Sequence, residues 1–217
     1  MNQFILFSRF DNIIFDLDGT LIDSAPSILN CLKKTLSIAH LKTNVSFLNC
    51  DLIGPTIVTI LQNLCPTETT EKISYAVSVF RKTYDDCPFA DCSVFPEAIH
   101  LLQQLRQEKK SLFMATNKPK KPTESLLSHL PLGSFEAVFT PDIHEGKILS
   151  KTTALELLIK QLNLNKQKTV MVGDTVSDMI SAKEAGIKSI AVLWGYEKNK
   201  ELLHTCADFI FEGMSDD

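Results

Sequence analysis

Short apolar runs that each end at a polar or small residue most strongly constrain how this 217-residue chain can fold. Three of these runs lead directly into Asp16, Thr116 and Asp174. Continuous apolar runs of this length are typical of strands that are buried on both faces, as in a parallel sheet. We therefore expect strands near residues 13–15, 112–115, 170–173, 189–193 and 209–211.

Apolar residues recur at helical spacing between these runs. The helical patterns cover residues 99–105, residues 155–162 after Lys151, and residues 180–185 after Asp178. Strands that alternate with helices predict an α/β fold with a doubly wound, Rossmann-like parallel sheet. Ligands of such sheets bind beyond the carboxyl ends of the strands, and the three polar residues should meet at that edge.

The interval from residue 24 to residue 94 interrupts this alternation, because it contains no convincing strand. Its apolar residues keep helical spacing over residues 28–39, 47–52, 57–64 and 73–80. We predict an all-helical cap domain that is inserted into the α/β core at joints near residues 24–26 and 94–96. The predicted domains are a core of residues 1–23 and 95–217 and a cap of residues 24–94.

Charge and composition argue against several kinds of partner. The formal net charge is −4 and the basic residues are scattered, so the chain has no basic field for a nucleic acid. No apolar stretch approaches the ~20 residues that cross a bilayer, and the first residues do not form a signal peptide. The six cysteines lack metal-binding spacing and are interpreted as reduced packing residues. We expect a cytoplasmic protein, monomeric or homodimeric, without a nucleic-acid or membrane partner.

The sharpest chemical signal is Asp16-Leu17-Asp18-Gly19-Thr20-Leu21, which comes directly after an apolar run. Two carboxylates that are two residues apart on a turn can both face one reacting group. A calcium-binding EF-hand loop is excluded, because it needs glycine at its sixth position and glutamate at its twelfth. Gly19 is only the fourth residue counted from Asp16.

This segment resembles the first motif of the haloacid dehalogenase superfamily in its phosphatase form. The other motifs follow in order: Thr116 resembles the second, Lys151 the third, and residues 173–178 the fourth. Within the superfamily, three phrases look like the phosphoglycolate phosphatase group, whose helical cap occupies the same place in the chain. They lie at residues 15–24, 116–119 and 194–196.

The resemblance implies a role for each motif residue. Asp16 would be the nucleophile that forms an aspartyl-phosphate, and Asp18 would serve as the acid and then the base. Thr116 and the amide of Asn117 would hold phosphate oxygens, while Gly19 would let the backbone approach the phosphate. Mg²⁺ is the implied cofactor. Its implied ligands are Asp16, the main-chain carbonyl of Asp18, and Asp174, with Asp178 acting through water or by holding its neighbours.

Several assignments stay open at this point. The catalytic lysine of the third motif is either Lys151, which is favoured because it opens a helical pattern, or Lys147. Lys118 contacts either the substrate or the solvent. The cap loop at residues 54–56 is either a simple turn or a loop that faces the site. Cap cations that either reach a substrate carboxylate or are merely solvated are Arg81, Lys82 and Lys72.

An acid at Asp18 suits an alkoxide leaving group, hence a phosphate ester. We therefore expect a magnesium-dependent phosphomonoester phosphatase that acts on a small phosphorylated metabolite, with 2-phosphoglycolate as the first candidate. One alternative is a phosphosugar mutase of the β-phosphoglucomutase type. Another is a non-catalytic binding or regulatory protein with the same fold, although the retained Asp16, Asp18, Thr116 and Asp174 argue against it.

Overall fold

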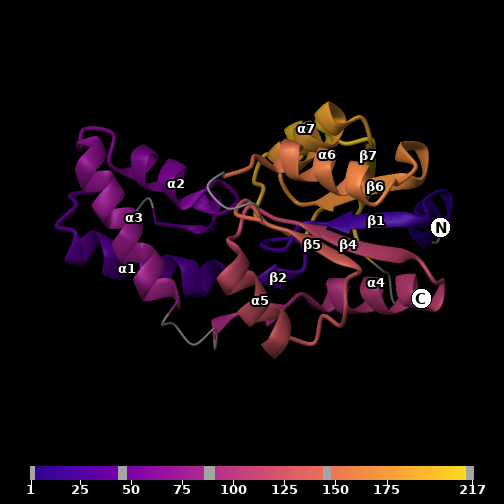
Figure 1. Cartoon of the computed structure of the whole chain (residues 1–217), viewed down its shortest axis with the longest axis horizontal. Coiled ribbons are helices and arrows are strands. Elements are labelled where there is room, and N and C mark those ends of the chain that lie inside the picture. Colours follow the sequence, from indigo (N-terminus) through magenta and orange to yellow (C-terminus); the bar gives the residue numbers. More distant parts are fainter. Residues whose placement is uncertain (1–2, 44–47, 86–90, 144–147, 214–217) are drawn as a thin grey trace.

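The computed structural model describes residues 3–43, 48–85, 91–143 and 148–213, which form two lobes (Figure 1). The larger lobe contains a six-stranded parallel sheet with the order β5-β4-β1-β6-β7-β8. β1 therefore lies at its centre, between β4 and β6. The strands are β1 (Asn12–Phe15), β4 (Ser111–Ala115), β5 (Ala137–Phe139), β6 (Thr169–Gly173), β7 (Lys188–Val192) and β8 (Phe209–Phe211).

Helices cover both faces of this sheet. Successive residues of a strand point to opposite faces, so each strand packs against helices on both sides. Ile14 packs on the face that carries α6 and α7, whereas Ile13 and Phe15 pack on the face that carries α4 and α5. The predicted doubly wound α/β fold is confirmed. The helices of this lobe are α4 (Pro96–Gln107), α5 (Lys120–His129), α6 (Lys151–Gln161), α7 (Val176–Ala185) and α8 (Lys200–Cys206).

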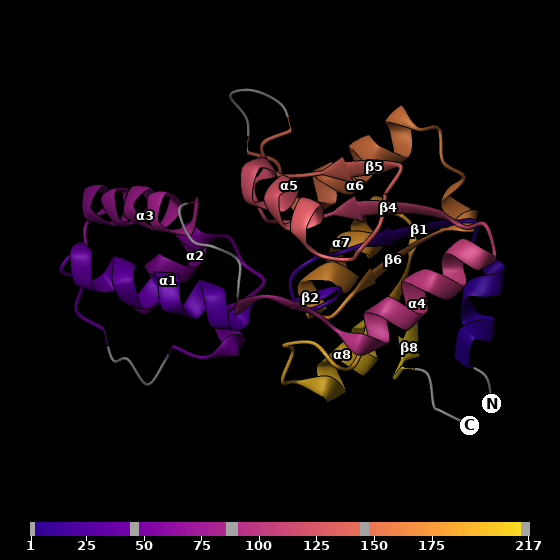
Figure 2. The ribbon, with the colours of Figure 1, turned by 90° about the horizontal axis from the view of Figure 1, so that it is seen from below.

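The smaller lobe is helical and has a hydrophobic core of its own. It consists of α1 (Ala25–Ile38), α2 (Ile57–Leu64) and α3 (Thr70–Asp85). Leu32, Leu61 and Ala76 are among its most buried side chains. This cap lies beyond the carboxyl end of β1, as both views show (Figures 1 and 2). Within the described ranges, no helix of either lobe has the length and apolar character to cross a bilayer.

The two crossings between the lobes lie side by side. β2 (Ile22–Asp23) leads into the cap and pairs antiparallel with β3 (Ser93–Val94), which leads out of it. Ser24 then begins the cap as the N-cap residue of α1. We propose this two-stranded ribbon as the boundary between a core of residues 1–23 and 95–217 and a cap of residues 24–94.

The structure corrects three details of the sequence interpretation. The helix expected over residues 47–52 is wrong, because only a single 3₁₀ turn forms there, at Cys50–Leu52, and residue 47 lies outside the described ranges. α7 begins at Val176, so that Asp178 lies inside its first turn rather than before it. The short elements β2, β3, β5, α5 and α8 were not predicted.

Candidate active site

Three polar residues that follow neighbouring strands meet at the carboxyl edge of the sheet. Asp16, Thr116 and Asp174 come directly after β1, β4 and β6, and all three are buried. The main chain continues the sheet pattern at two of them. The N–H of Asp16 donates to the carbonyl of Val172 at 2.9 Å, and that of Thr116 donates to Phe139 at 3.1 Å. Their backbones are therefore fixed by the sheet.

Three buried carboxylates form a compact acidic cluster at this edge. Asp16, Asp174 and Asp178 each place a carboxylate oxygen within 4.8 Å of the others. Asp178 is oriented by a capping box at the start of α7, where its carboxylate accepts hydrogen bonds from the N–H and hydroxyl of Thr175. Lys151 places its ammonium 2.8 Å from Asp16 and 2.5 Å from Asp178. Three carboxylates and one ammonium leave a formal charge of −2, which one divalent cation would balance.

Burial and mutual repulsion disfavour the ionised forms of this cluster in the protein without a metal. Burial raises the pKa of Asp16 to about 6, although Lys151 opposes the shift. Burial, with Asp178 and Asp16 adding to it, raises the pKa of Asp174 to about 8. Burial alone would lower the pKa of Lys151, but Asp16 and Asp178 outweigh it and hold that pKa above its ordinary value. Lys151 therefore stays charged at neutral pH.

One buried acceptor of the cluster has no protein partner. Among the described residues, Oδ1 of Asp16 accepts no hydrogen bond although it is shielded from solvent. An orphaned carboxylate oxygen of this kind is costly unless something else satisfies it. A hard cation with oxygen ligands fits this donor set, which consists of carboxylates alone. Asp16, Asp174 and Asp178 are therefore the residues that could hold a metal ion.

Asp174 is held from two sides. Its Oδ1 accepts from the hydroxyl of Thr20 at 2.9 Å, and its Oδ2 accepts from the N–H of Tyr196 at 2.8 Å. Two glycines make room for it. Gly19 has a φ of +83°, and a side chain there would collide with the Asp174 carboxylate, as would one at Gly195. Gly19 is thus required by the acidic cluster, a reason that sequence reasoning did not identify.

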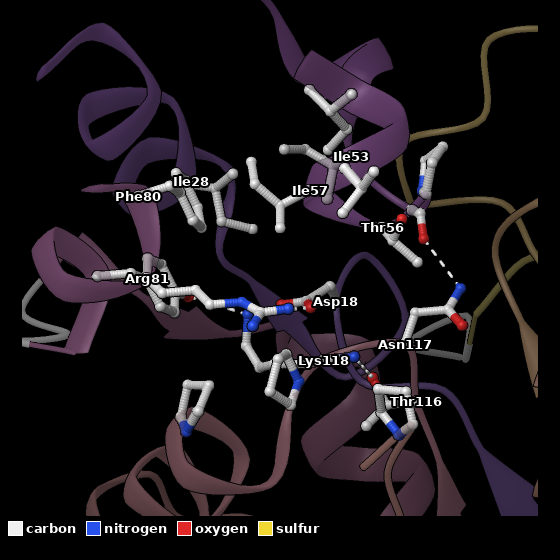
Figure 3. A pocket seen from close by; sticks show the side chains of 18 of the residues that line it. Asp18, Ile28, Ile53, Thr56, Ile57, Phe80, Arg81, Thr116, Asn117 and Lys118 are labelled. Atoms are coloured by element: carbon white, nitrogen blue, oxygen red, sulfur yellow. Dashed lines mark hydrogen bonds and ion pairs between the residues drawn. The ribbon is translucent and has the colours of Figure 1, made fainter. Parts of the chain in front are cut away.

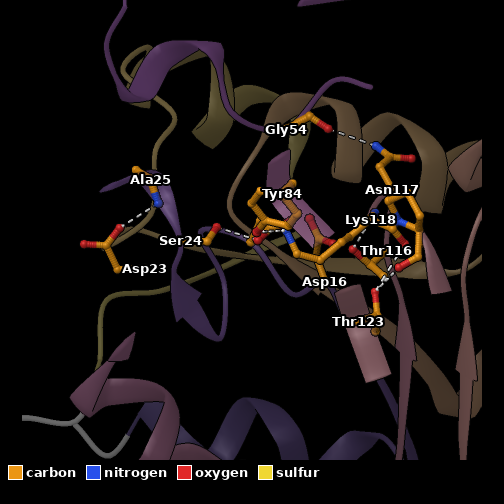
Figure 4. A network of polar contacts seen from close by, with 12 residues as sticks. Asp16, Asp23, Ser24, Ala25, Gly54, Tyr84, Thr116, Asn117, Lys118 and Thr123 are labelled. Atoms are coloured by element: carbon orange, nitrogen blue, oxygen red, sulfur yellow. Dashed lines mark hydrogen bonds and ion pairs between the residues drawn. The ribbon is translucent and has the colours of Figure 1, made fainter. Parts of the chain in front are cut away.

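Asp18 lies beside a separate, positively charged group. Its Oδ2 is 3.1 Å from the ammonium of Lys118, and its Oδ1 accepts from the hydroxyl of Ser24. Lys118 also donates to the hydroxyl of Tyr84 in the cap at 2.9 Å, and its main-chain N–H donates to Thr116 Oγ1 (Figure 4). Burial would lower the pKa of Lys118, but Asp18 and Tyr84 outweigh it and raise that pKa. Lys118 is therefore a buried cation in the site and not a solvated surface lysine.

A cavity of about 380 Å³ lies between the cap and the edge of the sheet (Figure 3). Its core wall includes Asp16, Asp18, Thr116, Asn117 and Lys118. The cap wall is mostly apolar, and it is formed by residues such as Ile28, Ile53, Ile57, Phe80 and the loop of residues 54–56. Besides the bond from Lys118 to Tyr84, a second contact joins the two walls, because the side chain of Asn117 donates to the carbonyl of Gly54 at 3.0 Å. The loop 54–56 therefore faces the site.

Comparison with known proteins decides the family. The sequence pattern of the haloacid dehalogenase-like hydrolases matches residues 13–192. The chain belongs to the haloacid dehalogenase-like hydrolase family. The resemblance found from the motifs alone is confirmed, and the match spans the inserted cap and every core strand except β8.

Relatives of this hydrolase include phosphatases. A phosphoglycolate phosphatase from Aquifex aeolicus is 34% identical over 187 residues, which cover 86% of each chain. A solved structure described as a predicted phosphatase from Clostridium acetobutylicum superposes with a TM-score of 0.82 at 27% identity and covers 93% of each chain. These likenesses support its classification as a phosphatase.

Some relatives carry a different name. The tyrosine-protein kinase PtkA of Mycobacterium tuberculosis is 30% identical over 198 residues, which cover 91% of this chain but only 64% of that protein. A family can host more than one activity, so the substrate has to be argued from the site itself.

The structure places the sequence-predicted residues in two adjoining groups. One group lines the cavity and consists of Asp16, Asp18, Thr116, Asn117 and Lys118. The other group surrounds the carboxylate of Asp16 and consists of Lys151, Asp174 and Asp178. The competing lysine, Lys147, lies outside the described residues. Sequence reasoning assigned no role to Ser24, Tyr84 or Tyr196. Ser24 and Tyr196 do fall within phrases shared with the phosphoglycolate phosphatase group, which was the available signal.

Because of the acidic cluster, the metal-free hydrolase should become less stable as the pH rises. The folded-state pKa values of Asp16 and Asp174 lie above the ordinary value of 3.8, so the folded protein binds more protons than the unfolded chain. The free energy of unfolding should therefore fall as pH rises from about 4 to about 8. Thermal unfolding in EDTA across this range measures it.

Two controls isolate the contribution of the cluster. Mg²⁺ should remove most of the decline, because a cation that binds only the folded state stabilises it. Asp174→Asn should flatten the decline in EDTA, because it removes the group with the largest shift. The electrostatic account of the cluster would be contradicted if the free energy of unfolding of the wild type in EDTA rose steadily from pH 5 to pH 8 and that of Asp174→Asn rose in parallel.

Proposed function

We propose that this protein is a Mg²⁺-dependent phosphomonoester phosphatase that works through an aspartyl-phosphate on Asp16, with 2-phosphoglycolate as its substrate. The observation that carries the proposal is the position of Asp16. Asp16 lines the cavity and touches the buried ammonium of Lys151. One of its carboxylate oxygens, beside two further acids, has no partner within the described part of the chain. A nucleophile and a cation site thus share one residue.

The proposed reaction consists of two successive displacements at phosphorus. Asp16 attacks the phosphorus while the bond to the ester oxygen breaks, and Asp18 gives its proton to the departing alkoxide. Asp18 then takes a proton from a water molecule that attacks the aspartyl-phosphate, which releases inorganic phosphate and restores Asp16. Bound to Asp16, Asp174 and the main-chain carbonyl of Asp18, with Asp178 as a supporting residue, Mg²⁺ would neutralise charge on the phosphoryl group.

Three neighbours of Asp16 would hold the phosphate. Thr116 and Lys118 belong to the same cavity wall as Asp16 and Asp18. We propose the hydroxyl of Thr116 and the ammonium of Lys118 as two of the donors. The main-chain amide of Asn117 is proposed as a further donor, while its side chain holds the cap loop at Gly54. Donors fixed in advance in this way stabilise the charge that develops during phosphoryl transfer.

Arg81 is the cap cation that we propose for the carboxylate of 2-phosphoglycolate. It lines the cavity, and its side chain extends from α3 into it (Figure 3). Lys72, which sequence reasoning also considered, is paired with Glu68 at 2.8 Å. Lys82 is exposed on the same helix and does not line this cavity. The position of Arg81 is the support for a carboxylate-bearing ester.

Arg81→Met should therefore raise KM for 2-phosphoglycolate about tenfold, since a charged hydrogen bond is worth about 1.5–3 kcal/mol before solvent screening reduces it. KM for an ester without a carboxylate, such as ethyl phosphate, should change less than about twofold on the same reasoning. Steady-state kinetics with both esters measures the difference, and Lys82→Met is the matched control. Equal changes in KM for the two esters would show that Arg81 does not recognise the carboxylate.

The function itself is tested by phosphate release from a panel of esters, with and without Mg²⁺. The panel contains 2-phosphoglycolate, sugar phosphates, nucleoside monophosphates and pyrophosphate, because a cavity of about 380 Å³ also admits larger molecules. Mg²⁺-dependent release with a preference for 2-phosphoglycolate is the expected result. Transfer between sugar positions with little net release would instead indicate a mutase. We place the activity in the cytoplasm, in a monomer or homodimer.

A further inference from the structure

The residues Trp194-Gly195-Tyr196 have no role in the chemistry proposed above. Each of them nevertheless contacts either Thr20, in the turn that follows β1, or Asp174 of the acidic cluster. The indole N–H of Trp194 donates to the carbonyl of Thr20 at 3.0 Å. Gly195 packs against the side chain of Asp174, and the N–H of Tyr196 donates to the carboxylate of Asp174. The segment that follows β7 is therefore fixed to the acidic cluster by its main chain.

The phenol of Tyr196 reaches in the other direction, to the first crossing into the cap. It donates to Oδ1 of Asp23 at 2.9 Å and accepts from the N–H groups of Ser24 at 2.8 Å and Ala25 at 3.0 Å. One donor and two acceptor sites are the full capacity of a phenol hydroxyl. Burial raises the pKa of Tyr196, so the hydroxyl keeps its proton at neutral pH. Tyr196 thus binds three consecutive residues of the crossing.

These contacts fix the main chain at the start of α1. The first N–H groups of a helix need partners outside the helix, and Ser24, the N-cap residue, makes no side-chain capping bond. The N–H groups of Ser24 and Ala25 are held by the phenol of Tyr196, and that of Ala25 also by Asp23. The buried hydroxyl of Ser24 donates to Oδ1 of Asp18, so its direction depends on where these bonds hold the main chain of Ser24.

We propose that Tyr196 is a positioning residue for the acid–base carboxylate. Its phenol accepts from the N–H groups of Ser24 and Ala25, which fixes the main chain of Ser24 and directs the Ser24 hydroxyl to Asp18. Through its own N–H the same residue holds Asp174, so the cap crossing, the acid–base group and the acidic cluster share one anchor. The inference rests on the proposed function, because it assigns Asp18 to proton transfer.

Tyr196→Phe removes only the phenol oxygen and keeps the main-chain bond to Asp174. A misplaced general acid slows the departure of a poor leaving group but hardly affects a good one. We expect kcat/KM for 2-phosphoglycolate, an alkyl ester, to fall about tenfold, a fraction of the 10²–10⁴ that a general acid contributes. For 4-nitrophenyl phosphate it should fall less than about twofold, because nitrophenolate leaves without protonation.

A double-mutant cycle identifies the route of the effect. Ser24→Ala should show the same dependence on the leaving group, and adding Tyr196→Phe to it should cost little more, because both changes release the same carboxylate. Tyr75→Phe, at an exposed tyrosine of α3, is the matched control and should behave like the wild type. Equal losses for the two esters, or additive losses in the double variant, would overturn the inference.

Amide hydrogen exchange tests the anchor without any activity. In Tyr196→Phe the amide of Ser24 should exchange about tenfold faster, because its acceptor is gone, and that of Ala25, which keeps Asp23 as a second acceptor, should exchange faster by a smaller factor. The amide of residue 196 itself should keep its protection. Unchanged exchange at Ser24 and Ala25 would overturn the inference while leaving the proposed function intact. A wild type that hydrolyses neither ester would overturn the proposed function, and the role of Asp18 with it.

Discussion

Asp16→Asn is expected to abolish phosphate release, with kcat at least about 10⁴-fold below the wild type, because the amide cannot act as a nucleophile towards phosphorus. The substitution keeps the shape of the side chain and removes only its charge. The buried site should tolerate it, because burial already raises the pKa of Asp16 and makes its ionised form costly. Phosphate release under saturating Mg²⁺ measures the loss, and thermal unfolding shows that the variant is folded.

Asp11→Asn is the matched control for this loss. Asp11 is an exposed carboxylate that precedes β1, whereas Asp16 follows the same strand. Its replacement should leave kcat within about twofold of the wild type, as is usual for surface substitutions. A folded Asp16→Asn variant that retained a tenth of the wild-type activity would show that Asp16 is not the nucleophile.

Lys151→Met is the change with the second largest expected effect. Lys151 is the buried cation that contacts both Asp16 and Asp178, and its charge is what lowers the pKa of Asp16 against burial. Without it, a smaller fraction of Asp16 is ionised at neutral pH and the repulsion of the phosphate is less offset. We expect kcat/KM to fall about 10³-fold, in the range found for electrostatic groups of this kind. The acidic limb of the pH–rate profile should move to higher pH.

Lys147→Met separates the two lysines that the sequence left open. Lys151 is predicted to be the catalytic lysine, so Lys147→Met should keep kcat/KM within about twofold of the wild type. Lys160→Met, at an exposed position near the end of α6, controls for the loss of a lysine from that helix. A severe loss in Lys147→Met together with a mild one in Lys151→Met would reverse the assignment.

The meeting of polar residues at one edge of the sheet was predictable because parallel strands order their carboxyl ends. Once the runs before Asp16, Thr116 and Asp174 are taken as neighbouring parallel strands, their polar residues must meet at one edge, as they do in the structure. β5 (Ala137–Phe139) escaped prediction although it is as long as β8 (Phe209–Phe211). β8 consists of Phe and Ile, which favour strands, whereas β5 begins with Ala, which is depleted in them.

Contacts between the cap and the core could not be predicted from sequence. Lys118 was equally compatible with substrate or solvent, because its surroundings depend on Tyr84, a residue of the separate cap. Ser24 marked only the joint with the cap in the sequence, and the position of Tyr196 was needed to show that the main chain of Ser24 is held where its hydroxyl donates to Asp18. In both cases the deciding partner is more than thirty residues away in the chain.

The most direct test of the central claim is a search for phosphate bound covalently to Asp16. The wild type is mixed with Mg²⁺ and 2-phosphoglycolate that carries a radiolabelled phosphoryl group, and the reaction is stopped with acid within one turnover. We expect labelled protein, and hydroxylamine should remove the label, as it does from an acyl phosphate. The label should map to the peptide that contains Asp16 and should be absent from Asp16→Asn. Release of labelled phosphate with no labelled protein at any time, or a label on another residue, would contradict it.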